Sequence, residues 1–192
     1  MEATVIIGTF GNPSWHTMGC TRAGPTVEAQ TVPTDHLHIH GPDLASARNQ
    51  GAAEAGTDWI CFLDADDQLD PGYIEAMLAA DGDIRRPATR GYHPTTGVIE
   101  PPVMIPRRPI LEANFIVIGA LVRRDLFLEV GGFDPTLPCL EDWDLWIRMT
   151  RAGATIVDVP AAVYQVTVYP NSRNQNPKTH AAAYTTIRRR YR

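Results

Sequence analysis

The stretch Trp59-Ile60-Cys61-Phe62-Leu63-Asp64-Ala65-Asp66-Asp67 decides the fold, because five apolar residues run directly into three carboxylates separated by one alanine. An apolar run of this length predicts a strand buried on both faces, as in a parallel α/β sheet. The carboxylates then emerge at the carboxyl end of the strand, where such sheets bind ligands. Asp64 and Asp66 are two positions apart, so both side chains point to one side if strand geometry persists.

Paired carboxylates of this kind repel each other unless a cation joins them. The usual cation is Mg²⁺ or Mn²⁺, which takes oxygen ligands from one or two carboxylates and the rest from water and substrate phosphates. A plain solvated turn is the alternative, since Asp70 and the following proline can start a helix over Pro71–Ala80. That alternative leaves the three earlier carboxylates unexplained. An EF-hand calcium loop is excluded, because Leu69 falls where that loop needs glycine.

The composition predicts one soluble globular domain. The chain has 192 residues, 44% of them hydrophobic and 20% charged, which suits a single packed core. A net charge of -5 gives no sign of nucleic-acid binding. Cys20, Cys61 and Cys139 form no closely spaced pair, so we expect reduced thiols. The start lacks a basic leader and no long apolar stretch occurs, so we expect a cytoplasmic protein without a transmembrane segment.

Along the rest of the chain, the patterns predict alternating strands and helices, as in a mostly parallel sheet. The expected elements are a strand Thr4–Ile7, a short helix from Ser14 that fails by Gly24-Pro25, strands Thr26–Val32 and Asp35–His40, a helix from Asp43 or Ser46 to Gly56, the helix Pro71–Ala80, hairpin arms Asp83–Arg90 and Gly97–Pro101, an apolar run Asn114–Val122, a helix from Glu141 to Gly153, strands Thr155–Val159 and Ala162–Val168, and a basic helix Ala181–Arg192. Pro170–Thr179 is polar and expected to be mobile.

Three of these segments have more than one interpretation. The alternation in Asp35–His40 puts three histidines on one face, where a metal could bind, but an exposed strand face is favoured. Glu141 and Asp142 open a helix whose dipole stabilises acids, an explanation that needs no chemistry. The apolar and basic tail predicts docking on a partner subunit, as in a homodimer, or on an anionic surface. A solvated helix end is the alternative for the tail.

The joint pattern resembles the family 2 glycosyltransferases with the GT-A fold. In that family a segment like Ser46-Ala47-Arg48-Asn49-Gln50-Gly51 leads into one like Phe62-Leu63-Asp64-Ala65-Asp66-Asp67, and a later segment corresponds to Val130–Asp134 followed by Glu141–Arg148. The resemblance implies an α/β, Rossmann-like three-layer sandwich with a mostly parallel central sheet. It also implies one GT-A domain over residues 1–192: a nucleotide-sugar-binding region over residues 1–113, an acceptor and catalytic region over residues 114–169, and a mobile loop with a C-terminal helix over residues 170–192.

The activity implied by this resemblance is inverting transfer of a sugar from a nucleotide diphosphate sugar, with a UDP-sugar as the first expectation, to an acceptor hydroxyl of undetermined class. Asp142 would be the general base, and Asp66 would hold Mn²⁺ or Mg²⁺. The metal neutralises the leaving diphosphate while the base takes the hydroxyl proton, and a single displacement inverts the anomeric centre. The nucleotide-sugar-binding residues implied are Thr9, Phe10, Gly11, Arg48, Asp64, Ala65, Asp66, Gly119 and Glu141.

Two segments depart from the family pattern. Gln30–Asp35 replaces the Asp-Asp-Gly-Ser that usually ends the second strand, and Thr167–Tyr169 replaces a late Arg-x-His. A non-catalytic module that binds a sugar nucleotide or a partner is therefore the alternative function. A sugar-phosphate nucleotidylyltransferase is disfavoured, because Asn12–Gly24 lacks the long glycine-rich loop and the lysine of that class.

Overall fold

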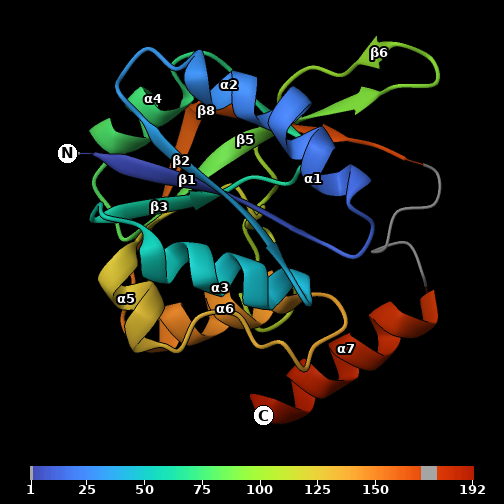
Figure 1. Cartoon of the computed structure of the whole chain (residues 1–192). Helices are drawn as coiled ribbons and strands as arrows, with labels where there is room; N and C mark the ends of the chain where they lie inside the picture. The colour runs from blue at the N-terminus through green and yellow to red at the C-terminus, as the bar shows by residue number, and fades with distance from the viewer. Residues whose placement is uncertain (1, 170–176) are drawn as a thin grey trace.

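One eight-stranded sheet forms the centre of the protein in the computed structural model, which describes residues 2–169 and 177–192 (Figure 1). The strands run in the order β2-β1-β3-β7-β5-β8-β4, with β6 paired to β5. The long pairings, β1 with β2 and β5 with β8, are parallel, whereas β7 is antiparallel to both of its neighbours. The strands are β1 Ala3–Phe10, β2 Asp35–Gly41, β3 Trp59–Phe62, β4 Gln68–Leu69, β5 Ile84–His93, β6 Val98–Ile99, β7 Leu121–Arg123 and β8 Ile156–Thr167.

Helices cover both faces of this sheet. The short helices α1 and α2 lie with α4 on one face, and α3, α5 and α6 lie on the other, with α7 beside α6 (Figure 1). Their bounds are α1 Ser14–Met18, the π-helix η1 Gly19–Ala23, α2 Gly24–Glu28, α3 Leu44–Glu54, α4 Tyr73–Ala79, α5 Arg124–Glu129, α6 Glu141–Arg151 and α7 Pro177–Arg190. The expected α/β three-layer sandwich is therefore confirmed.

The acidic strand lies where its sequence predicts. Every residue of β3 is buried, because helices cover both faces of the sheet at this point. Helix α3 packs tightly against β1, since a Cβ on Gly51 would come within 2.4 Å of the Ile6 side chain. Asp43 caps α3 by accepting a hydrogen bond from the backbone N–H of Ser46. Strand β7 lies between β3 and β5, so the expected donor and acceptor regions share one sheet.

Three expectations about local structure are wrong. Thr26–Val32 forms no strand, because helical structure continues through Gly24 and Pro25, and Pro25 stands in the first turn of α2, where proline is tolerated. The two expected closing strands are one, β8, whose register with β5 shifts at Pro87. Asp70 does not cap α4, because the helix begins only at Tyr73 with Gly72 at its N-cap, and the Asp70 carboxylate pairs with Arg90 instead.

The last helix docks on its own chain. Ala183 and Ile187 of α7 are buried, and Ile187 packs with Trp143 and Ile147 of α6. The apolar face of the tail is thus used within the chain, while a homodimer stays a prediction. Most of the expected mobile loop, residues 170–176, lies outside the described residues. In the described part of the chain, no helix combines the length and apolar character that crossing a bilayer requires.

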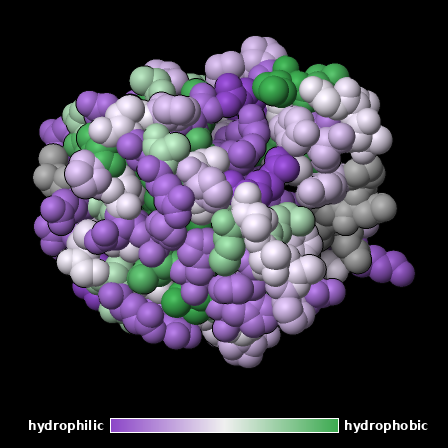
Figure 2. Space-filling view, turned by 45° about the horizontal axis from the view of Figure 1, so that its top comes forward, coloured by the Kyte–Doolittle hydropathy of each residue, from purple (hydrophilic) through white to green (hydrophobic). Residues whose placement is uncertain are grey.

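The surface in Figure 2 is mainly hydrophilic with several apolar areas, one of which lies at the upper right of the view. Val98 and Ile99 of the β5–β6 hairpin are 52% and 58% exposed. As expected, the arms on either side of residues 94–97 pair antiparallel. The hairpin is not merely an edge element, because β5 continues into the middle of the sheet.

Candidate active site

The loop after β3 holds its carboxylates in three different environments. The backbone N–H of Asp64 donates to the hydroxyl of Tyr164, and the N–H of Asp67 donates to the carbonyl of Asp64. The buried carboxylate of Asp67 accepts a 2.7 Å hydrogen bond from the backbone N–H of Thr167. Burial, and then Asp64 and Asp66, raise the pKa of Asp67 well above its usual value. Asp67 therefore ties the loop to β8, whereas Asp64 and Asp66 are only partly buried.

Arg48 joins the donor and acceptor sides of the candidate site. This arginine of α3 is only 3% exposed, and it donates to Oδ1 of Asp64 and to Oε1 of Glu141. Its guanidinium also lies 5.4 Å from the centre of the Phe133 ring. Burial alone would lower its pKa, but Asp64 and Glu141 hold the pKa of Arg48 above its usual value. Three residues implied by the family resemblance are thus brought together from distant parts of the chain.

Asp142 follows Glu141 in the first turn of α6 and is part-buried. Its Oδ1 accepts from the backbone N–H of Trp143 at 2.8 Å, and its Oδ2 accepts from Nδ2 of Asn114 at 2.9 Å. Burial and the neighbouring Glu141 raise the pKa of Asp142 to about 6, against the opposing effects of these donors and of Arg48. A carboxylate with a pKa near neutrality is suited to accept a proton.

The backbone before Asp142 is strained. Leu140 has a φ of 61° and is the only non-glycine residue with positive φ in the described part of the chain. A leucine in this conformation costs free energy and persists only where packing enforces it. Leu140 packs against the cluster that contains Trp143 and Ile187. That packing therefore sets the direction from which α6 presents Asp142.

The carboxylate of Asp66 could offer oxygen ligands to a cation. Among the described residues, no arginine, lysine or histidine forms an ion pair with it, although Nε of Arg22 donates to its backbone carbonyl at 2.7 Å. Burial, and then Asp64, raise the pKa of Asp66 to about 6. Two carboxylates at a strand end suit a hard cation. Over residues 2–169 and 177–192, no three acidic, histidine or cysteine side chains group as a complete ion site, so any ion here would need further ligands from substrate and water.

The loop after β1 lies at the same edge of the sheet as the acidic loop, because β1 pairs in parallel with β3. Thr9 pairs in register with His40 of β2, and its Oγ1 lies 3.0 Å from Nδ1 of that histidine. Phe10 is 38% exposed at the strand end, and Gly11 has a φ of 70°, which a side chain would disfavour. Thr9, Phe10 and Gly11 thus lie at the carboxyl ends of the strands, as a nucleotide-binding loop requires. Trp15, 41% exposed on α1, adds a second aromatic face nearby in the chain.

Ala65 and Gly119 lie deeper than the other implied residues. Ala65 is buried beneath the π-helix, because a Cβ on Gly19 would come within 3.6 Å of its side chain. The carbonyl of Gly119 accepts a 2.6 Å hydrogen bond from the Tyr73 hydroxyl, and a Cβ at this position would lie 2.1 Å from the Tyr164 ring. Since Tyr164 bonds Asp64, Gly119 supports the acidic loop from behind.

The histidine face of β2 is partly covered, contrary to expectation. His38 packs against the π-helix, with its Nδ1 3.6 Å from Sγ of Cys20, and its ring lies 5.1 Å from that of His36. Burial, followed by His36 and His16, lowers the pKa of His38. His38 is therefore a close-packed neighbour of the π-helix, in an environment that favours its neutral form.

Arg22 and Asn114 are the residues of the candidate site that sequence reasoning missed. Arg22 reaches both the carbonyl of Asp66 and the hydroxyl of Thr167, which is the position where the family carries its late Arg-x-His. The expected break at Gly24-Pro25 hid the helical register of Arg22. Asn114 stands at the start of an apolar run in the sequence, and nothing in that run indicates its contact with Asp142.

Sheet order and acidic strand end together define a nucleotide-diphospho-sugar transferase fold of the GT-A class. The structure of S. aureus TarS residues 1–349 superposes with a TM-score of 0.69 at 15% identity, covering 97% of this chain and 64% of that one. The same TarS region in complex with UDP-GlcNAc gives a TM-score of 0.68 at 14% identity, covering 92% of this chain and 61% of that one. At this level of sequence identity, the two similarities are evidence for the fold alone.

Sequence comparison names the family. Residues 36–89 match the profile of Glycosyl transferase family 2. The pre-mycofactocin glycosyltransferase of Mycobacterium tuberculosis is 32% identical over 148 residues, which is 67% of this chain and 30% of the relative. The N-acetylglucosaminyl-diphospho-decaprenol L-rhamnosyltransferase of that organism is 28% identical, over 86% of this chain and 69% of the relative. The chain belongs to glycosyl transferase family 2 and spans about a third of the length of the first of these relatives.

Proposed function

We propose that this chain transfers a sugar from a nucleotide diphosphate sugar to an acceptor hydroxyl with inversion, and that Asp142 is the general base. The observation that carries the proposal is the bridge made by Arg48 between Asp64, at the end of the donor strand, and Glu141, beside Asp142. The bridge places Glu141, the neighbour of the proposed base, and Asp64, the proposed donor-binding carboxylate, on two nitrogens of one guanidinium. Such an arrangement lets a hydroxyl be deprotonated while it attacks a bound sugar.

On the donor side, Asp66 would hold Mn²⁺ or Mg²⁺, because its carboxylate has no ion-pair partner among the described residues and supplies the oxygen ligands these ions prefer. When bound, such an ion neutralises the charge that develops on the leaving diphosphate. Arg22 contributes positive charge on the same side through its contact with the Asp66 backbone. Phe10 and Thr9 would border the nucleoside.

A UDP-sugar is the donor we propose, since a fold neighbour is described in complex with UDP and with UDP-GlcNAc. The relatives are described with different acceptors, a pre-mycofactocin and a diphospho-decaprenol, so the acceptor is proposed only as a hydroxyl group. The second candidate function, a non-catalytic binding module, is favoured by one observation. Thr167 stands at the end of β8 in place of the family's Arg-x-His, which removes a cationic contact to the diphosphate.

Product analysis of Asp142→Asn and the wild type tests the proposal. The wild-type chain, incubated with UDP-sugars, Mn²⁺ and a panel of hydroxyl acceptors, should release UDP and a product of inverted anomeric configuration. The variant keeps the shape and loses the base, so turnover should fall by roughly 10²–10⁴ while UDP affinity stays unchanged. Asp58→Asn, at an exposed carboxylate, serves as the matched control. Release of pyrophosphate would indicate nucleotidyl transfer, and binding without any product would favour the module.

A further inference from the structure

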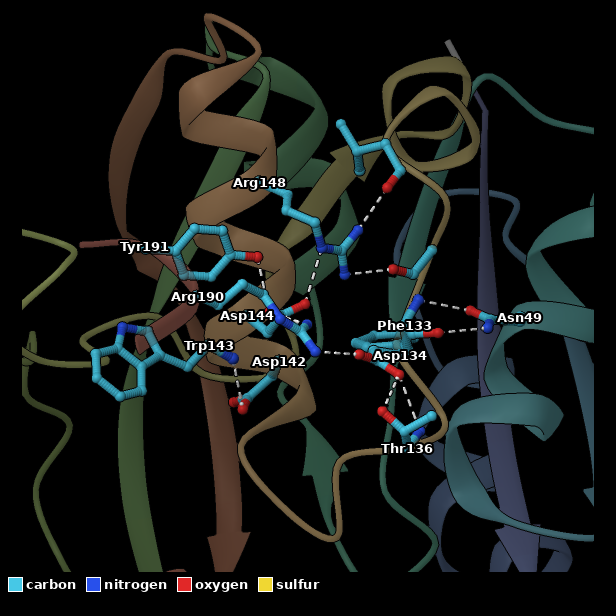
Figure 3. A network of polar contacts seen from close by, with 12 residues as sticks. Asn49, Phe133, Asp134, Thr136, Asp142, Trp143, Asp144, Arg148, Arg190 and Tyr191 are labelled. Carbon is cyan, nitrogen blue, oxygen red and sulfur yellow. Dashed lines mark hydrogen bonds and ion pairs between the residues drawn. The ribbon is translucent and has the colours of Figure 1, made fainter. Parts of the chain in front are cut away.

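A second acidic side chain of α6, Asp144, is fully buried at 0% exposure, two residues after Asp142 (Figure 3). Its Oδ2 accepts from Nε of Arg148 within the same helix at 2.8 Å. Its Oδ1 accepts from the guanidinium of Arg190 at 2.8 Å and from the hydroxyl of Tyr191 at 2.7 Å. A buried carboxylate is stable only with such partners, so the C-terminal segment supplies much of what Asp144 needs.

Arg190 also contacts the segment that precedes α6, residues 130–135, which contains Gly131 and Gly132 and is called the glycine turn below. Its second guanidinium nitrogen lies 2.8 Å from Oδ2 of Asp134, a carboxylate that further accepts from the backbone N–H and hydroxyl of Thr136. Arg148 holds the same turn by donating to the carbonyls of Val130 and Gly132, both at 2.6 Å. Arg148 of α6 and Arg190 of α7 thus attach the glycine turn to the N-terminal end of α6.

The turn is in contact with the donor side as well. The side-chain amide of Asn49 on α3 donates to the carbonyl of Phe133 and accepts from its N–H, each at 2.8 Å (Figure 3). The Phe133 ring lies under the guanidinium of Arg48. A continuous set of contacts therefore runs from Arg190 through Asp134 and Phe133 to Arg48. Its other branch runs through Asp144 to the helix turn that carries Asp142.

We infer that Arg190 is a positioning residue: by bridging Asp134 and Asp144 it locks the glycine turn against α6 and thereby sets where Asp142 stands relative to Arg48. The bridge needs two nitrogens in one rigid plane, which arginine has and lysine lacks. Apolar contacts assist it, since Ile187 is buried against Trp143 and the Tyr184 ring stacks on Trp143 at 5.3 Å. The functional meaning of this lock rests on the proposed role of Asp142, but its geometry does not.

Hydrogen exchange of the purified full chain tests the lock without any substrate. In Arg190→Ala, amides in residues 130–146 should exchange at least about tenfold faster than in the wild type, and amides of α3 should exchange at the wild-type rate. Arg190→Lys, which keeps the charge, should restore only part of this protection. The matched control is Arg189→Ala, which removes a neighbouring exposed arginine and should change nothing.

A carboxyl titration by ¹³C NMR supplies the readout that a purely structural role would not move. Loosening α6 admits water to Asp142, so its pKa should fall in Arg190→Ala and stay unchanged in Arg189→Ala. With substrates, kcat should fall about tenfold while KM for the donor stays within twofold. If the wild type proves inactive, the proposed function fails, and exchange and titration still decide the role of Arg190.

Faster exchange confined to α7, with the titration of Asp142 unchanged, would overturn the inference and leave α7 as a stabilising cover. If Arg190→Ala does not fold, Tyr191→Phe removes one of the C-terminal donors to Asp144 and should give smaller changes of the same sign. No change in exchange of residues 130–146 in that variant would equally overturn it.

Discussion

Asn114 donates a 2.9 Å hydrogen bond from Nδ2 to Oδ2 of Asp142, while its own Oδ1 accepts from the backbone N–H of Ile116. The second contact fixes the orientation of the amide, because turning it over would lose both hydrogen bonds. The donor therefore faces the carboxylate, and it stabilises the ionised form. Asn114 thus sets both the direction and the proton affinity of the candidate base.

Asn114→Ala should raise the pKa of Asp142 above its value of about 6, because the charged carboxylate loses a donor. If Asp142 is the base, the acid limb of kcat against pH should move to higher pH. The matched control is Gln50→Ala, which removes a surface amide bonded only to the neighbouring helical Glu54. An acid limb that stays in place or moves to lower pH would contradict this role of Asn114.

Asp142→Asn should stabilise the protein at pH 8 and have little effect at pH 4. The folded pKa of about 6 lies above the usual 3.8, so the native state binds the proton more tightly and stability falls as pH rises between these values. Removing the charge therefore raises the free energy of unfolding by up to about 3 kcal/mol at pH values well above 6. Urea unfolding of the variant, the wild type and an Asp35→Asn surface control at both pH values measures this. If the variant is also more stable than the wild type at pH 4, the stabilisation has a cause other than the charge of Asp142.

Asp66→Asn should weaken metal-dependent nucleotide binding by at least about tenfold, since a hard cation loses a charged oxygen ligand. The fold should persist, because Asp66 joins the rest of the structure mainly through its backbone carbonyl, which accepts from Arg22 and Thr167. Calorimetry with UDP and Mn²⁺, repeated with a chelator, measures the effect, and Asp58→Asn is the control. Wild-type affinity for the Mn²⁺ and UDP pair in the variant would remove Asp66 from the metal site.

Gly119→Ala should destabilise the fold by about 2–3 kcal/mol rather than impair nucleotide binding alone. The new methyl group would lie 2.1 Å from a ring carbon of Tyr164, and the hydroxyl of that tyrosine is engaged by the backbone of Asp64. Gly56→Ala is the matched control, because a Cβ there meets nothing within 4 Å. Thermal unfolding separates the two variants. Equal melting temperatures would mean that Tyr164 moves freely, against the packing described.

Local patterns allowed the acidic half of the site to be predicted from the sequence. The apolar run into Asp64 and Asp66 specifies a buried strand whose end is charged, and Glu141-Asp142 before an apolar helix specifies a helix start. Neither depends on contacts with distant residues. The resemblance to a family added Arg48, whose pairing with residues 16 and 93 positions away has no local signal.

Long-range contacts explain what the sequence did not reveal. Asn114 reaches Asp142 across 28 positions from an irregular loop, and Arg190 reads locally as one arginine in a basic tail. Thr26–Val32 misled because its β-branched residues favour a strand, whereas Gly24 and Pro25 before it are tolerated in the first turn of a helix. Packing of α2 against β2 stabilises the helical conformation of this segment.

The lock between Asp144 and Arg190 also has a consequence for biosynthesis, because these residues are 46 positions apart. At a translation rate of roughly 5–20 residues per second, Asp144 is made roughly 2–9 s before Arg190. By the end of that interval the nascent chain contains every described strand of the sheet, yet Asp144 has had only its helical neighbour Arg148 as a cationic partner. We therefore expect the helix that carries Asp142 to settle last, after the donor half has folded on the ribosome.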